Sequence, residues 1–199
     1  MTAPETRPSL LIRVRDHEDR DAWDEFAQIY RPVIMRLAHI RGLQSADAED
    51  LAQRVLMAVA RAIPNWEPDP VRAKFRTWLR TIADNAILNA LTRGLPDHAS
   101  GDDDMRLLLE KRPANDGPES GLLQVEFRRE VFARAAQQIR GEFSDDTWMS
   151  FWLTAVDGLE IEAAAEQLGR TRGSVYASRS RVIKRLKRAV DEFCSEIEE

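Results

Sequence analysis

The chain has 199 residues, which is enough for one large domain or two small ones. Hydrophobic residues make up 43% of it, so a real core is expected, and Cys194 is the only cysteine, which excludes an internal disulfide and any multi-cysteine metal site. The net charge of −5 argues against a protein that simply coats DNA. No apolar stretch has the length of a membrane span or a signal peptide, so we expect a cytoplasmic protein without membrane insertion.

The charges are distributed unevenly along the chain. Between Arg170 and Arg188 there are eight basic residues and no acidic one, whereas residues 96–120 hold seven acidic residues against three basic. The second stretch is rich in Pro, Gly, Asp and Ser, and we interpret it as a flexible acidic linker. The alternative is a long surface loop within one domain, but structureless loops of that length are uncommon in compact domains.

Residues 1–95 are predicted to form a helical domain. Ser9 caps a first helix, and a stripe that includes Trp23, Phe26 and Tyr30 marks a second. Pro32 is expected to start a further helix that ends at Gly42. The next helix begins at Ser45 and ends near Pro64, and the last begins at Phe75.

Residues 121–199 are predicted to form a second helical domain. A first helix carries Leu123, Phe127 and Ile139, and Ser144 caps the next one, whose inward positions include Trp148 and Ala155. No segment alternates with period two, so we expect an all-α fold: two small helical domains joined by the flexible acidic linker.

The C-terminal domain contains a predicted helix-turn-helix. A short helix over residues 161–168 precedes Gly169, where a tight turn requires a residue without a Cβ, and Thr171 caps a second helix. The first turns of that second helix would enter the major groove of DNA. The alternative is a basic, solvated helix in an ordinary helical domain, which the concentration of positive charge disfavours.

Several segments together resemble a known family. Residues 47–53 (DAEDLAQ) resemble the polymerase-binding signature of extracytoplasmic-function (ECF) sigma factors of the sigma-70 superfamily, and residues 75–85 (FRTWLRTIADN) resemble their promoter-melting helix. Residues 9–11, 22–23 and 30–32 resemble the family's first helices, and residues 173–182 resemble a variant of its recognition helix. Ala163 to Ala165 depart from the usual acidic-Ile-Ala pattern, which leaves the preferred minus-35 sequence open.

The resemblance implies a non-enzymatic protein whose first domain binds core RNA polymerase and opens promoter DNA at the minus-10 element, while the second reads the minus-35 element. It also implies an anti-sigma factor as a partner, and no cofactor, metal or small-molecule substrate. Core polymerase is expected to contact Asp47, Asp50, Gln53, Arg54, Leu56 and Met57. Minus-10 DNA is expected to contact Arg72, Lys74, Arg76, Arg80, Asn85, Asn89 and Arg93. Minus-35 DNA is expected to contact Arg172, Ser174, Tyr176, Arg179, Arg181, Lys184 and Arg185.

These roles also have physical readings. Asp47 and Asp50 lie at a helix start, where carboxylates are favoured, so capping alone is an alternative to polymerase binding. Asn85, Asn89 and Arg93 recur every four residues and are expected to form a polar stripe opposite the core.

The tryptophans near this helix have two readings. Trp66 is either a surface on which a base stacks or a residue that closes the helical core. Trp78 is expected in the core.

Other function classes fit less well. An enzyme lacks support because the acidic cluster at residues 47–50 has no partnering histidine, phosphate loop or nucleophile motif. A helix-turn-helix repressor or activator that acts without polymerase leaves the motifs at 47–53 and 75–85 without a role. A helical adaptor that binds only proteins leaves the basic stretch unexplained.

Overall fold

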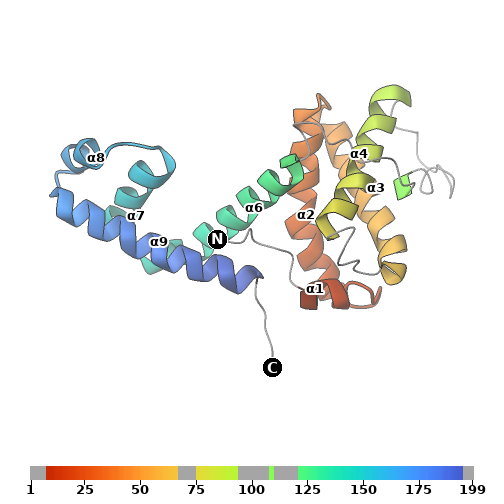
Figure 1. Cartoon of the computed structure of the whole chain (residues 1–199), viewed down its shortest axis with the longest axis horizontal. Helices are drawn as coiled ribbons and strands as arrows, with labels where there is room; N and C mark the ends of the chain where they lie inside the picture. The colour runs from red at the N-terminus through yellow and green to blue at the C-terminus, as the bar shows by residue number, and fades with distance from the viewer. Residues whose placement is uncertain (1–7, 67–74, 94–107, 110–120, 195–199) are drawn as a thin grey trace. The chain divides into compact units, whose positions relative to one another are not determined.

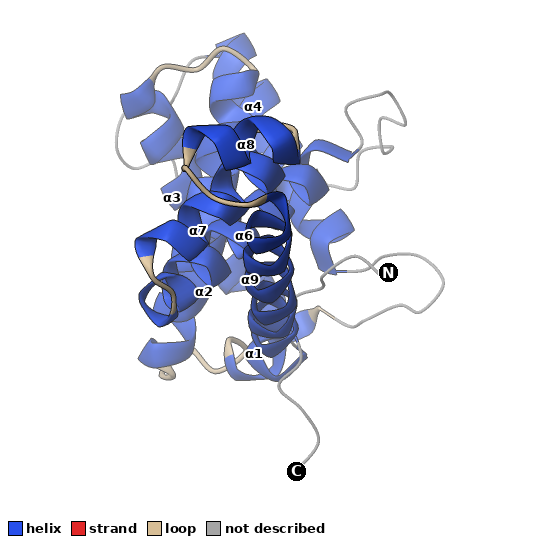
Figure 2. Ribbon diagram, turned by 90° about the vertical axis from the view of Figure 1, so that its left-hand side faces the viewer, coloured by secondary structure: helices blue, strands red, loops and turns tan. Residues whose placement is uncertain are grey.

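The structure is a computed structural model that describes residues 8–66, 75–93, 108–109 and 121–194. Every regular element in these ranges is helical, which confirms the all-α prediction (Figure 2). The chain divides into two compact units, one comprising Glu5–Glu130 and the other containing Val131–Glu199. None of the described helices is both long and apolar enough to cross a lipid bilayer.

The first unit is built on the long helices α2 (Arg20–Ile40), α3 (Ser45–Ala62) and α4 (Phe75–Arg93) (Figure 1). α2 packs along α3, and α3 packs along α4. Phe26, Tyr30, Leu51, Val55 and Leu79 are among the fully buried side chains between them. The short helix α1 (Pro8–Arg13) precedes α2, and the 3-10 turn η1 (Ile63–Asn65) follows α3.

The prediction that Pro32 starts a new helix is wrong, because α2 runs through it without a break. A proline inside a helix removes one backbone hydrogen bond. Here Tyr30, Val33 and Ile34 on both sides of it are completely buried, so packing of the continuous apolar stripe outweighs that loss. The helix ends as predicted at Gly42, whose φ of 94° is a left-handed conformation that glycine adopts without strain.

Helix α6 (Leu122–Ile139) carries the border between the units. Its first half, up to Glu130, belongs to the first unit. Ala135 and Ile139 in its second half join the core of the second unit, where they pack with Trp148, Phe151 and Val182.

The second unit continues with η3 (Arg140–Glu142), α7 (Asp145–Phe151), a π-helical turn η4 (Trp152–Val156), α8 (Ile161–Gln167) and α9 (Arg172–Cys194). Ser144 occupies the N-cap position of α7 as predicted, but its hydroxyl makes no capping hydrogen bond to the helix backbone and donates instead to Thr147 Oγ1 at 3.1 Å. The inward placement of Ala155 is wrong, because Leu153 and Thr154 are buried in η4 while Ala155 is exposed. A π turn holds more residues than an α turn, and it therefore shifts which side chains face the core.

Candidate functional site

The six predicted polymerase-binding residues all lie on α3, between its first turn and its last. Asp47, Asp50, Gln53 and Met57 are exposed, while Arg54 and Leu56 are half-buried. Spacings of three and four place the exposed residues along one side of the helix. The structure therefore brings a strip of two carboxylates, an amide and a thioether to the surface. Glu49, which lies four residues before Gln53, pairs with Arg31 of α2 and links the two helices.

The predicted minus-10 residues on α4 are placed differently from the expectation. Asn85 is only 3% exposed, and its Nδ2 donates to the backbone oxygen of Leu108 at 3.0 Å. Arg76 is 6% exposed, and its Cζ lies 4.6 Å from the centre of the Phe127 ring. The expectation of a polar stripe opposite the core is therefore wrong for Asn85, because Leu108 covers that side of α4. The DNA-binding role of Asn85 stays a prediction.

The other minus-10 positions have mixed surroundings. Arg80 is largely buried, and its Nε donates to Asp84 Oδ2 at 3.1 Å, so one of its nitrogens already has an anionic partner. Asn89 is half-buried. Arg72 and Lys74 lie outside the described residues, and for Arg93 only the helical backbone is described.

An aromatic cluster closes the end of the first unit where α4 begins. The rings of Trp66, Phe75 and Trp78 lie with their centroids 5.5–5.9 Å apart in every pairing. Phe75 also meets Phe26 and Tyr30 of α2 at 5.8 Å. Both tryptophans are half-buried, which favours the core-closing interpretation and leaves part of each ring at the surface.

The helix-turn-helix is present in the second unit as α8, a short turn and α9. Gly169 has φ of 62°, and the backbone N–H groups of Gly169 and Arg170 donate to the oxygens of Glu166 and Ala165 at 3.2 and 2.9 Å. This is the Schellman arrangement that ends a helix on a left-handed residue. No atom outside its chain neighbours lies within 4 Å of a Cβ placed on Gly169, so the backbone conformation, not space, requires the glycine.

The start of α9 is held by two side chains. Thr171 Oγ1 accepts a hydrogen bond from the N–H of Ser174 at 3.2 Å, which confirms the predicted cap. Arg170 spans from α7 to α9: its Nη1 donates to Asp146 O and to Ser150 Oγ, each at 2.9 Å, and its Nη2 donates to Ser174 Oγ at 2.6 Å. Sequence reasoning counted Arg170 only as part of the basic stretch. The positioning role could not be read from spacing because the partners of Arg170 on α7 lie 20 and 24 residues away.

Ion pairs engage two of the predicted minus-35 arginines. Arg172 Nη1 donates to Glu162 of α8 at 2.5 Å, and this hydrogen bond lowers the pKa of the Glu162 carboxyl. The two side chains are 70% and 62% exposed, so water screens the pair and DNA can compete for the arginine. Arg185 forms a forked pair with Glu142 at 2.7–3.1 Å and lies 3.5 Å from Glu192, and the Glu142 hydrogen bonds raise its pKa.

The remaining minus-35 positions are open to solvent to different degrees. Tyr176 is 61% exposed, which places a large aromatic side chain at the surface near the start of α9. Arg181 and Lys184 are exposed, and Arg179 and Ser174 are half-buried. Among the described residues, no three His, Cys, Asp or Glu side chains gather where they could hold a metal ion.

Comparison with known proteins agrees with this geometry. Residues 26–94 match the family described as sigma-70 region 2, so the helical unit that carries the α3 strip and α4 is a sigma-70 region 2 domain.

Three curated relatives are ECF RNA polymerase sigma factors. RpoE of Cereibacter sphaeroides is 32% identical over 89 residues, which cover 43% of this chain and 46% of the relative. SigE of Mycolicibacterium smegmatis is 31% identical over 88 residues, covering 44% and 33%, and SigW of Bacillus subtilis is 32% identical over 80 residues, covering 40% and 41%. The chain spans less than half the length of each of these relatives. These findings confirm the resemblance to ECF sigma factors that is seen in the motifs.

Proposed function

We propose that this protein is an alternative sigma factor, which binds core RNA polymerase and directs it to a class of promoters. The observation that carries the proposal is the exposed strip on α3 within a sigma-70 region 2 domain, in the same chain as a helix-turn-helix. A repressor that acts alone has no need of the strip. The role is one of recognition and not of catalysis.

The strip suits a basic, partly apolar protein partner. Asp47 and Asp50 supply negative charge, which steers association and fixes register with a positive surface. Met57 is 46% exposed and adds an adaptable apolar contact. Such a surface is complementary to a basic helical element of core polymerase, which is the partner that we propose for it.

The second unit supplies the proposed contact with the minus-35 element. α9 begins at Arg172 behind the Thr171 cap, and the positive end of its helix dipole favours the approach of a phosphate. Arg172, Ser174 and Tyr176 lie in its first turns, where a recognition helix contacts base edges. Arg181 and Lys184, further along, are exposed and suited to phosphates.

The domain limits belong to the proposal. We propose a polymerase-binding domain at 1–95, a connecting segment at 96–120 and a helix-turn-helix domain at 121–199. Of the connecting segment, the structure describes only Leu108 and Leu109. An anti-sigma factor that holds the protein inactive is a further proposed partner, based on the family.

In vitro selection of promoter DNA tests the proposal. A random duplex library is selected twice, once with core polymerase reconstituted with this chain and once with the chain alone. We expect two enriched elements at fixed spacing in the first selection only, since core polymerase fixes the separation of two weak sites. Strong enrichment by the chain alone, unchanged by core polymerase, would instead identify a repressor or activator.

A further inference from the structure

The first half of α6 buries a face that contains two carboxylates. Leu123, Glu126, Phe127 and Glu130 follow one another at helical spacing, and their exposed fractions are 2%, 1%, 3% and 9%. Glutamate is almost never buried to this degree unless it is paired. This half of α6 is therefore docked through a specific polar arrangement as well as through apolar packing.

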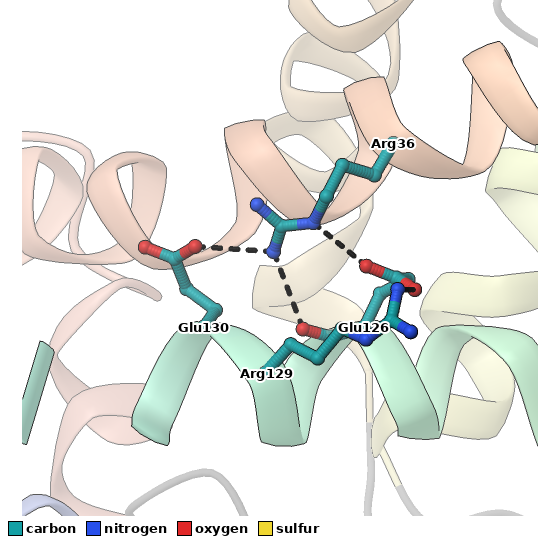
Figure 3. Close-up of polar contacts among 4 residues, drawn as sticks. All are labelled: Arg36, Glu126, Arg129 and Glu130. Carbon is teal, nitrogen blue, oxygen red and sulfur yellow. Dashed lines mark hydrogen bonds and ion pairs between the residues drawn. The ribbon is translucent and has the colours of Figure 1, made fainter. Parts of the chain in front are cut away.

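Arg36 of α2 supplies the pairing (Figure 3). Its Nε donates to Glu126 Oε2 at 2.7 Å, and its Nη2 donates to Glu130 Oε2 at 3.1 Å and to the backbone oxygen of Glu126 at 3.3 Å. Arg129 completes the set by donating to Glu126 Oε1 at 2.8 Å. One guanidinium thus binds two consecutive turns of α6. Loss of Arg36 would leave the carboxylates of Glu126 and Glu130 buried without this cationic partner, which is destabilising.

Phe127 of α6 contacts both α2 and α4. Its ring stacks on Tyr30 with centroids 5.6 Å apart, and the guanidinium of Arg76 lies over it at 4.6 Å. A cation over an aromatic face is attracted by the ring quadrupole, more strongly when water is excluded. Arg76 is 6% exposed, so its charge lies in the interior of the unit and is withheld from solvent.

Leu108 covers a second proposed DNA contact in the same way. Its side chain is 7% exposed, and its backbone oxygen accepts the hydrogen bond from Asn85. Two side chains proposed to bind the minus-10 element are therefore covered by parts of the chain that follow α4. Meanwhile Asp47, Asp50 and Gln53 on α3 stay exposed.

We propose that the first half of α6, together with Leu108, is an intramolecular cover that keeps Arg76 and Asn85 from DNA until it is released. The inference rests on the proposed function, because it concerns the regulation of the proposed minus-10 surface. It implies an order of events: polymerase can engage the open α3 strip while the cover is closed, and the minus-10 surface becomes available only afterwards.

Arg36→Glu tests the cover, since it places a third carboxylate against Glu126 and Glu130. We expect faster hydrogen–deuterium exchange of the amides at residues 122–130, because an undocked helix of this length is marginal in water. We also expect the full-length chain to bind a fixed single-stranded DNA 20-mer about tenfold more tightly. The net charge of the variant is two units more negative, which by itself would weaken binding to DNA. A gain in affinity therefore cannot come from the charge change.

The matched control is Arg20→Glu, which makes the same charge change at an exposed position at the start of α2. It should leave exchange in α6 unchanged and should not raise the affinity for the 20-mer. Phe127→Ala opens the cover without a charge change and provides a second route if Arg36→Glu fails to fold. Adding Arg76→Ala to either opening variant should remove most of the gain.

The inference is overturned if exchange in α6 rises without a gain in affinity, if the gain survives Arg76→Ala, or if neither opening variant speeds exchange. No polymerase is present in these measurements. If the opening variants gain affinity as expected but the chain selects no promoter with core polymerase, the inference about the cover stands and the proposed function is wrong.

Discussion

The guanidinium of Arg170 lies 2.6 Å from the hydroxyl of Ser174, and the same side chain binds Asp146 and Ser150 of α7. A single residue of the turn thus links the start of the proposed recognition helix to the helix behind it. The orientation of Ser174 therefore depends on a residue that itself need not contact bases.

Arg170→Ala should lower the free energy of unfolding of the second unit by about 1–3 kcal/mol, because it removes hydrogen bonds from a charged donor. Ser150 is completely buried and would lose one of its partners. Thermal denaturation followed by circular dichroism measures the effect. Arg181→Ala, at an exposed position of α9, should change the stability by less than about 0.5 kcal/mol. Equal losses in the two variants would contradict the positioning role.

Glu162 should titrate below the ordinary range of a glutamate carboxyl. The hydrogen bond from Arg172 lowers its pKa, so the ion pair is fully formed above the unfolded value and is lost as the pH falls through the lowered folded value. Carbon-13 NMR of the carboxyl checks this, and Arg172→Ala should return the pKa towards its ordinary value. The same pKa in wild type and Arg172→Ala would show that the pair does not form in solution.

Lys184→Ala and Arg185→Ala should differ, although both positions are predicted to contact minus-35 DNA. Lys184 is exposed, and its loss should weaken binding of all duplexes and reduce the salt slope by about 1. Arg185 is paired with Glu142 and Glu192, so its loss should also lower the melting temperature of the free protein. Salt-dependent binding and thermal melts, measured side by side, separate the two effects. Indistinguishable variants would mean that the Arg185 pairs are not formed in solution.

Much of the fold could be predicted because local signals and tertiary packing agree. The left-handed Gly42 and Gly169, and the cap at Thr171, depend only on neighbouring backbone. The predicted helix start at Pro32 was wrong because the hydrogen bond that a proline removes from a helix is outweighed by the buried apolar stripe of α2, which extends to both sides of Pro32.

The candidate site was harder to predict where long-range contacts decide the side-chain environment. Asn85 looked exposed because its cover, Leu108, lies 23 residues later. The buried pairs of Arg36 with Glu126 and Glu130 join residues 90 and 94 positions apart, and charged residues at such separations carry no periodic signal that would reveal burial. On α3, by contrast, the exposed strip follows directly from helical spacing.

The most direct test of the central claim is run-off transcription with core polymerase from a promoter obtained by selection, comparing wild type with Asp50→Ala/Gln53→Ala. We predict a transcript only when the chain and core polymerase are both present, a large loss in the double variant with unchanged helical content, and wild-type activity in the control Asp24→Ala, which removes an exposed carboxylate from α2. Tight, sequence-specific DNA binding by the chain alone, with no transcript on addition of core polymerase, would contradict the sigma-factor function.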